Sequence, residues 1–378
     1  MIRAIFISLA LLLPFGLLAE EKAAFGSKYI AQLQSNPSKF IASEIQEPFN
    51  FFGMAIYLNN IGLFVFDSKT DQLIPLEEEA TLSQGQWFVA VGRFKVMLVK
   101  KSDLELTFTD GTLKFTNPEI LGTSETIVHI ASKRDLKQIS PNLDKIRYSH
   151  LWAPIAWLAK LVEASLVGIQ ANIVSSWGIT ILVFTLMLKA LFIPIGIMTV
   201  RFQRRVSQVK SILEPQLKEI KEKYDGEEAH NRLMAAHKEQ GVSPFYTLKP
   251  LMASFIQIPF LIAIFNALGE MEQFVGQSFL WMEDLAYPDA IAHFSFSMPM
   301  FGSSLNLLPF IMTGVTLAST ILFQNRQASA KEMSATKKNL YLMSAAFMIL
   351  FYPFPAAMVF YWTLANLTQM IQQQVVKI

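Results

Sequence analysis

Residues 173–194 read IVSSWGITILVFTLMLKALFIP and set the architecture of this chain. A run of about 20 predominantly apolar residues is long enough to cross a bilayer as a helix. Trp177 is expected at the outer interface and Arg201 at the inner one, because tryptophan and basic residues gather at those depths. Lys189 lies twelve residues from each of them, about 18 Å at helical rise, so its side chain does not easily reach water from either side.

Lys189 is therefore the first candidate functional residue. An ammonium group at that depth is costly in lipid, and a helix bundle tolerates it where water or polar partners are supplied. Ionisable groups in such places commonly mark a pathway or a substrate site. The alternative is a buried lysine that stays neutral, has no partner and carries no function.

The composition agrees with an integral membrane protein. Hydrophobic residues make up 52% of the 378 residues and charged residues 16%, whereas soluble domains carry about 25% charged residues. The mean hydropathy is +0.35. Cysteine is absent, which excludes disulfides, thiolate catalysis, cysteine-ligated zinc and a lipoprotein anchor.

Residues 1–19 predict a signal peptide or an uncleaved signal-anchor. Arg3 is a minimal positive region, and an apolar run follows it from Ala4 to Ala19. Pro14 and the short length of the run favour cleavage slightly. In either form, this segment exports the residues that follow it.

Residues 20–132 are predicted to form a β-rich domain on the outer, periplasmic side. Trp87–Val91 and Phe94–Val99 are short apolar runs typical of strands. Leu104–Phe115 alternates apolar and polar residues around Asp110-Gly111, the strongest hairpin signal in the chain. We expect a small antiparallel sheet or sandwich, and the region shows no catalytic constellation.

A polar linker is predicted at residues 133–150 and an amphipathic helix at 151–170. The helix carries Trp152 on an apolar side, with Lys160 and Glu163 on a polar side. That pattern suits a helix lying in the membrane interface. The alternative is an outer extension of the next membrane span.

Four further apolar segments complete a predicted five-span helical core over residues 171–378. Tyr352-Pro-Phe-Pro355 indicates a tight turn between the last two spans. The expected fold class is an all-α polytopic membrane protein with a small extracytoplasmic β domain. The four segments are residues 250–268, 305–323, 340–351 and 356–376.

The charges of the connecting loops predict the orientation of the core. Residues 201–249 hold ten Lys and Arg against seven Asp and Glu, and residues 324–339 hold four against one. Residues 269–304 hold five acidic residues and no basic one. Because basic loops stay in the cytoplasm, the first two loops and the C-terminus are expected inside and the acidic loop outside. Trp281 of that acidic loop, like Trp152 and Trp177, is expected to anchor the outer interface.

The loop at 201–249 predicts a protruding helical hairpin. Its first half carries an apolar stripe at helical spacing from Val209 to Tyr224, and its two halves divide at Asp225-Gly226. A docking arm for a cytoplasmic partner is one interpretation. A solvated connector, whose stripe only holds the hairpin together, is the other.

The predicted spans carry polar side chains on selected faces. Thr185 lies one turn before Lys189, and Gln257 lies within the next span. Trp362, Asn366, Gln369 and Gln373 share one face of the last span, and Thr313, Thr316 and Thr320 share a face of another. Such residues can simply hydrogen-bond helices together. A shared hydrated cavity explains all of them at once.

Enzyme motifs are missing from the sequence. It contains no glycine-rich phosphate loop, no nucleotide signature and no HExxH, and its five histidines do not cluster. We therefore expect no enzymatic activity, no cofactor and no metal site.

Three motifs resemble the YidC-type membrane protein insertases. They are FIQIPF at Phe255–Phe260, FLWMEDLAYPD at Phe279–Asp289, and FPAAMVFYWTLANLTQMIQQ at Phe354–Gln373. The resemblance covers about residues 151–376. It implies a five-helix core around a hydrophilic groove that opens to the cytoplasm and to lipid, with a cytoplasmic helical hairpin.

The resemblance also implies which residues form the groove. Lys189 occupies the position where the family usually has arginine, so the charge is kept but the forked geometry is lost. Thr185 and the pair Tyr361-Trp362 match positions thought to touch substrate. The implied location is the bacterial inner membrane. The implied partners are nascent membrane proteins and lipid, with the Sec translocon and the ribosome (through residues 201–249) as candidates and no DNA.

The expected function is insertion and folding of nascent membrane proteins. A hydrophilic segment would enter the groove, where Lys189 attracts its acidic residues and Thr185, Gln257 and Asn366 replace lost hydration. Two alternatives stay open. One is a secondary transporter of a small anion with Lys189 as counter-ion, and the other is a scaffold or chaperone for which Lys189 is dispensable.

Overall fold

The structure is a computed structural model that describes residues 27–44, 62–76, 78–243, 245–246, 249–298, 301–322 and 330–375. The predicted signal segment at 1–19 lies outside the described residues. In the cytoplasmic loop predicted at 324–339, residues 324–329 are likewise not described, and residues 330–339 belong to helix α10 (Ala330–Phe351).

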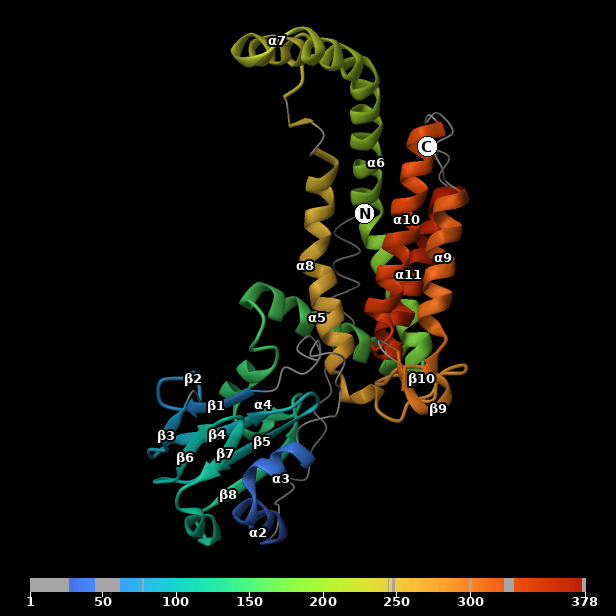
Figure 1. Ribbon diagram of the computed structural model, residues 1–378. Helices are drawn as coiled ribbons and strands as arrows, with labels where there is room; N and C mark the ends of the chain where they lie inside the picture. The colour runs from blue at the N-terminus through green and yellow to red at the C-terminus, as the bar shows by residue number, and fades with distance from the viewer. Residues whose placement is uncertain are drawn as a thin grey trace.

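A β domain lies at one end of the molecule and a helical part extends away from it (Figure 1). The end of the helical part next to the β domain is called the β-domain end here. The opposite end carries a helical hairpin made by α6 (Trp177–Lys223) and α7 (Gly226–Glu239), and is called the hairpin end.

In the described residues, the β domain contains two antiparallel sheets, which two short helices precede in the chain. The larger sheet has the strand order β2-β1-β4-β5-β8 and the smaller one β3-β6-β7. The helices, which the sequence pattern did not predict, are α2 (Ser27–Ser35) and α3 (Pro37–Glu44). The strands are β1 (Gly62–Asp67), β2 (Gln72–Pro75), β3 (Glu79–Thr81), β4 (Gln86–Val91), β5 (Lys95–Lys100), β6 (Glu105–Thr109), β7 (Thr112–Phe115) and β8 (Ile127–Ser132).

The predicted hairpin at Asp110-Gly111 is present. It joins β6 to β7, with Thr109 opposite Thr112. Asp110 has φ 50° and Gly111 has φ 71°, and a two-residue turn with positive φ at both positions matches the twist of the strands it joins.

Strand β4 explains why the run at Trp87–Val91 is apolar throughout. Phe88 and Ala90 pack on one face of the sheet, toward α2, α3 and the smaller sheet. Trp87, Val89 and Val91 pack on the other face against Leu136, Leu143 and Ile146. Because both faces are covered, the strand carries no polar alternation.

The segment predicted as a polar linker is therefore folded onto the sheet. It forms α4 (Leu136–Ile139) and a 3₁₀ turn at Pro141–Ile146. Its charged residues concealed three apolar positions, spaced too irregularly to indicate an element, that are 0–1% exposed. The segment is therefore not a linker but one layer of the β domain.

Helices α5 to α11 form the helical part. Helix α8 packs on α5 and α6, and α11 packs on α6, α8 and α9. The predicted amphipathic helix at 151–170 corresponds to α5. The bounds not yet given are α5 (Ala153–Asn172), α8 (Lys249–Glu270), α9 (Leu308–Leu322) and α11 (Ala356–Val375).

Helix α6 is longer than the sequence pattern indicated. The membrane span and the hairpin at 201–249 were predicted as different parts of the core, but α6 runs without a break through both for 47 residues, with Pro194 and Pro215 inside it. At helical rise this is about 70 Å. The apolar half and the charged half are one helix because its backbone hydrogen bonding does not depend on the change in composition.

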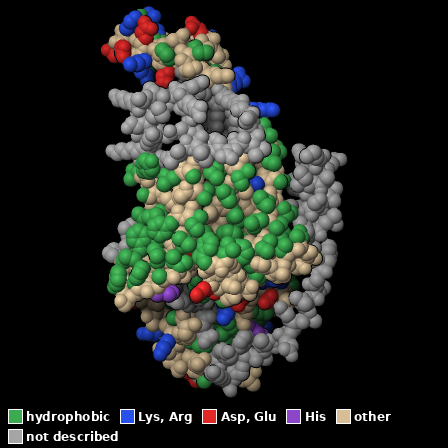
Figure 2. Space-filling view, turned by 90° about the vertical axis from the view of Figure 1, so that its right-hand side faces the viewer, with side chains coloured by type: hydrophobic (Ala, Val, Ile, Leu, Met, Phe, Trp, Pro, Cys, Tyr) green, Lys and Arg blue, Asp and Glu red, His purple; other side chains and the backbone are tan. Residues whose placement is uncertain are grey.

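By length and composition, one helical segment in the described ranges, Trp177–Met198, is able to span a membrane, with mean hydropathy 2.3. Gln257–Glu270, Leu308–Ser319 and Tyr341–Phe351 are shorter apolar helices. Hydrophobic side chains cover much of the helical part in the view of Figure 2, between charged groups at its two ends. A five-span core therefore stays a prediction.

The loop between α8 and α9 contains structure that was not predicted. A 3₁₀ turn at Glu272–Phe274 is followed by a β-hairpin of β9 (Ala290–Met298) and β10 (Gly302–Asn306). Figure 1 shows this hairpin at the β-domain end, beside α9 and α11.

Candidate functional site

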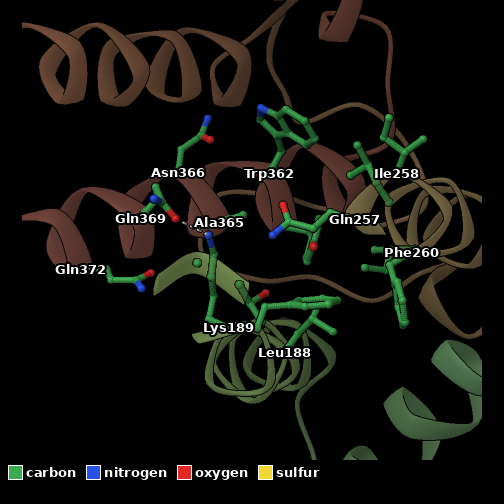
Figure 3. A pocket seen from close by; sticks show the side chains of 16 residues that line it. Leu188, Lys189, Gln257, Ile258, Phe260, Trp362, Ala365, Asn366, Gln369 and Gln372 are labelled. Atoms are coloured by element: carbon green, nitrogen blue, oxygen red, sulfur yellow. Dashed lines mark hydrogen bonds between the residues drawn. The ribbon is translucent and has the colours of Figure 1, made fainter. Parts of the chain in front are cut away.

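A cavity of about 350 Å³ lies between α6, α8 and α11. Figure 3 shows side chains from the three helices pointing into it. All six residues predicted for a groove line this one cavity, from helices separated by long stretches of sequence. They are Thr185 and Lys189 on α6, Gln257 on α8, and Tyr361, Trp362 and Asn366 on α11.

Lys189 is half-buried in the cavity wall. Its Nζ donates a hydrogen bond to Oε1 of Gln369 on α11, at 3.1 Å. No ion pair of Lys189 occurs within the part of the chain that the structure describes. The ammonium group is therefore held by a neutral amide.

Thr185 and Tyr361 lie deeper in the wall than Lys189. Thr185 is 1% exposed, and its hydroxyl donates to the carbonyl of Ile181 in the same helix, at 2.7 Å. That hydroxyl hydrogen is already used, so Thr185 offers a ligand only an acceptor. Tyr361 is 6% exposed.

Carboxamides supply most of the other polar groups of the cavity. Gln257 is exposed on α8. Asn366 donates from Nδ2 to Oγ1 of Thr316 on α9, at 3.0 Å. This bond is the interhelical contact that was considered as the alternative to a cavity, so Asn366 joins two helices and lines the cavity as well.

Two polar lining residues were not among the predicted groove residues. Gln369 was recognised only as part of a polar stripe, and Gln372 was not recognised at all. Gln372 lies one turn further along α11 from Gln369, and its Nε2 lies 3.6 Å from the place of a Cβ on Gly196 of α6. The spacing of three residues was the available signal. Gln373 and Thr320, named in the same stripes, have side chains outside the described set.

Aromatic contacts join the helices that form the walls of the cavity. Phe192 of α6 meets Phe260 of α8 edge to face, with centroids 5.1 Å apart. Phe265 of α8 meets Trp362 of α11 in the same way at 5.6 Å. These contacts, each favourable beyond simple burial, fix the three walls relative to one another.

The loop motif Phe279–Asp289 packs over the β-domain end of the walls. The ring of Phe279 lies against Phe360 of α11, at 5.4 Å, and covers Gly178 of α6. Asp289 accepts hydrogen bonds from the backbone N–H of Leu308 at 2.6 Å and from Nε1 of Trp281 at 2.9 Å. Burial raises the pKa of Asp289 above its usual value. The motif thus holds the first turn of α9 in place.

The three tryptophans predicted as interface anchors differ in exposure. Trp152 is 75% exposed and Trp281 is 36% exposed. Trp177 is 8% exposed and packs edge to face against Phe274, with centroids 5.3 Å apart. Trp177 therefore lies in the core and not on a surface that faces lipid, because the first turn of α6 is covered by the loop after α8.

Comparisons with known proteins identify the family. The profile of the family described as 60Kd inner membrane protein matches residues 169–378, which is more than half of the chain and contains the whole cavity. The chain belongs to this family, that of the YidC-type insertases.

Relatives named "Membrane protein insertase YidC" are similar over part of their length. The protein of Treponema denticola is 30% identical over 240 residues, 62% of this chain and 40% of that protein. The protein of Chlorobaculum tepidum is 29% identical over 203 residues, which are 53% of this chain and 32% of that protein. The protein of Chlamydia trachomatis serovar D is 34% identical over 208 residues, which are 53% of this chain and 25% of that protein. The matched part is thus less than half of each relative.

A solved structure described as "Active YidC insertase crystal structure with the first transmembrane domain resolved" is also similar. Its sequence identity is 18% and the TM-score is 0.41, with 81% of this chain and 67% of that chain covered.

Proposed function

We propose that this protein inserts nascent membrane proteins into the bacterial inner membrane through the cavity between α6, α8 and α11. The observation that carries the proposal is the ammonium group of Lys189, placed in a cavity wall with a neutral partner, Gln369. Membership of the 60Kd inner membrane protein family supports the same function.

The proposed mechanism is physical and breaks no bond. A short hydrophilic segment of the substrate enters the cavity, where Lys189 attracts its carboxylates and the amides of Gln257 and Asn366 replace lost water contacts. The apolar part of the substrate stays at the lipid side and partitions outward, driven by the burial of its apolar surface. Because the polar segment crosses part of the membrane in a polar site, its desolvation cost falls.

We propose an orientation with the hairpin end in the cytoplasm and the β domain in the periplasm. The charges support it, since the loop at 201–249 is basic and the loop at 269–304 is acidic. In this orientation α7 and the far half of α6 stand clear of the membrane as an arm. The ribosome and the Sec translocon are the candidate partners for that arm.

The cavity is also consistent with the alternative that it carries a small anion across the membrane with Lys189 as counter-ion. Nothing in the cavity favours this alternative over insertion. A direct assay separates the two, because a transporter moves anions whether or not a nascent protein is present.

The test uses the purified protein in liposomes without another translocon. A small single-span protein with an acidic translocated tail is synthesised, and its protection from external protease is measured. We expect protection with the parent protein, loss with Lys189→Ala and retention with Lys189→Arg, which keeps the charge.

Two other outcomes would contradict the proposed function. Protection that is equal in the parent and in Lys189→Ala would remove the groove charge from the mechanism and favour a scaffold. Absence of protection with the parent protein and with both variants, together with flux of a small anion, would favour the transporter.

A further inference from the structure

Arg93 is a fully buried arginine far from the cavity in sequence. It lies in the turn between β4 and β5 of the β domain and is 0% exposed. Burying a guanidinium group is costly unless hydrogen bonds compensate it. The partners of Arg93 therefore show what this turn is built to hold.

Two hydrogen bonds of the Arg93 guanidinium go to the helical part. Nε donates to the carbonyl of Gly269, in the last turn of α8, at 2.9 Å. Nη2 donates to the carbonyl of Ala286, in the loop after α8, at 2.8 Å. The guanidinium also lies over the rings of Phe94 and Tyr287, at 4.4 Å and 5.7 Å from their centroids. A cation is favourable at this place because helix C-termini carry partial negative charge.

The loop segment that Arg93 holds is bonded in turn to the start of α11. The backbone N–H of Ala357 donates to the carbonyl of Leu285 at 2.9 Å, and that of Ala356 donates to the carbonyl of Tyr287 at 2.8 Å. Residues 285–287 thus lie between Arg93 and the first turn of α11. Arg93 connects the end of α8 to the beginning of α11, the helices that carry two of the three cavity walls.

A second cation of the β domain reaches the same helix end. Lys133 follows β8, and its Nζ lies 2.7 Å from Oε2 of Glu270, with both side chains less than a tenth exposed. The backbone N–H of Lys133 donates to the carbonyl of Phe94 at 3.2 Å. Arg93 and Lys133 therefore act from adjacent positions on the last two residues of α8.

We propose that Arg93 is a positioning residue for the cavity. It ties the β-domain end of α8 to the β-domain end of α11 and so keeps that end of the cavity closed. The β domain is, on this proposal, a clamp on the core. A closed end would prevent leakage of water and ions during insertion. Only this last step rests on the proposed function.

The natural absence of cysteine gives a clean test. Ile264 of α8 lines the cavity and is 1% exposed, so a cysteine placed there by Ile264→Cys reacts slowly with a water-soluble maleimide. In the full-length protein in nanodiscs, we expect Arg93→Ala to raise its reaction rate about tenfold through local opening of the α8–α11 contact. Arg93→Lys keeps the charge but loses one of the two hydrogen bonds, so its rate should lie about threefold above the parent, between the parent and Arg93→Ala.

Two further cysteine variants act as controls. Leu98→Cys, at a position 0% exposed in β5, reports unfolding of the β domain. Ala365→Cys, in the middle of the cavity and already partly accessible, should keep its rate. An increase at position 264 with both control rates unchanged supports the tie.

An unchanged rate at position 264 in Arg93→Ala, with Leu98→Cys still protected, would overturn the proposal. If Arg93→Ala also exposes position 98, the β domain of that variant is unfolded, and the proposal is then tested with Arg93→Lys alone. A rate at 264 about threefold above the parent, with position 98 protected, is then expected, and no increase would overturn the tie. The readout needs no substrate, so a failed insertion assay leaves this result intact.

Discussion

Lys189 Nζ lies 3.1 Å from Oε1 of Gln369, and this hydrogen bond joins the first third of α6 to α11 across the cavity. The partner is neutral, so the bond orients the ammonium group without cancelling its charge. A carboxylate entering the cavity offers a stronger, charge-assisted hydrogen bond than an amide does. Gln369 is thus a resting partner that an acidic substrate segment is able to replace.

The first prediction changes this resting partner. Gln369→Glu places a carboxylate beside Lys189, and the internal ion pair competes with substrate. We expect insertion of an acidic-tailed protein to fall about tenfold, equivalent to about 1.4 kcal/mol. Gln369→Leu removes the acceptor without adding charge, so its loss should be smaller. Equal losses in the liposome assay would show that charge competition is not the cause.

A second prediction concerns packing at the β-domain end. A Cβ on Gly178 would overlap the ring of Phe279, whereas one on Gly314 of α9 meets nothing within 4 Å. Gly178→Ala should therefore destabilise the protein by about 1–3 kcal/mol, although alanine is the better helix former. Gly314→Ala should leave stability unchanged or raise it by up to about 1 kcal/mol. Thermal unfolding in detergent measures both, and the same sign for both would contradict the packing.

A third prediction tests the buried pair Lys133–Glu270, whose side chains are 8% and 3% exposed. Lys133→Met leaves the Glu270 carboxylate buried without its lysine, which should cost up to about 3–5 kcal/mol. Adding Glu270→Gln removes the carboxylate charge that Lys133 compensates in the parent, so the double variant should be more stable than Lys133→Met alone. Denaturant unfolding of the parent, the two single variants and the double variant measures the coupling, and additive losses would mean that the residues are not coupled.

A fourth prediction is a pH dependence. Burial acts to raise the pKa of Asp144, but the hydrogen bond from Lys160 and the charge of Arg147 outweigh it, so the pKa lies below its usual value. Because the folded-state pKa is depressed, the ionised carboxylate stabilises the fold above the unfolded-state pKa of about 3.9. That contribution is lost as the pH falls through the folded-state value.

The measurement for Asp144 is a comparison with Asp144→Asn. The variant should be less stable than the parent near pH 7, and the difference in unfolding free energy should shrink below about pH 4. Other carboxylates titrate in the same range in both proteins, so their contribution cancels. A difference that stays constant from pH 7 to pH 3 would show that Asp144 is not stabilised by its cations.

The features that were predicted correctly are those set by local sequence. Asp110-Gly111 specifies its own turn, and each apolar segment predicted as a span coincides with a helix, because turn chemistry and apolar length act over few residues. Lys189, Gln257 and Asn366 were identified as polar groups in apolar surroundings. The three side chains line one cavity, and the role of that cavity as a substrate groove stays a prediction.

The features that sequence reasoning missed depend on contacts between distant residues. Arg93 lies 176 residues from Gly269, and nothing near it in the sequence distinguishes it from a surface arginine in a turn. Trp177 was expected at a lipid interface, but the loop after α8 covers it. The continuity of α6 was not predicted because its apolar part and its charged part differ in composition and were assigned to a span and to a hairpin.

The most direct measurement asks whether a substrate lies in the cavity. A photo-crosslinking residue at Ala365, in the cavity wall, is compared with one at Leu342, which is 70% exposed on α10 and does not line the cavity. With a stalled nascent chain that carries an acidic segment, we expect crosslinks at 365 and few at 342. The crosslinks at 365 should be lost in Lys189→Ala and kept in Lys189→Arg. Equal crosslinking at both positions, or crosslinking at 365 that does not depend on Lys189, would contradict insertion through this cavity.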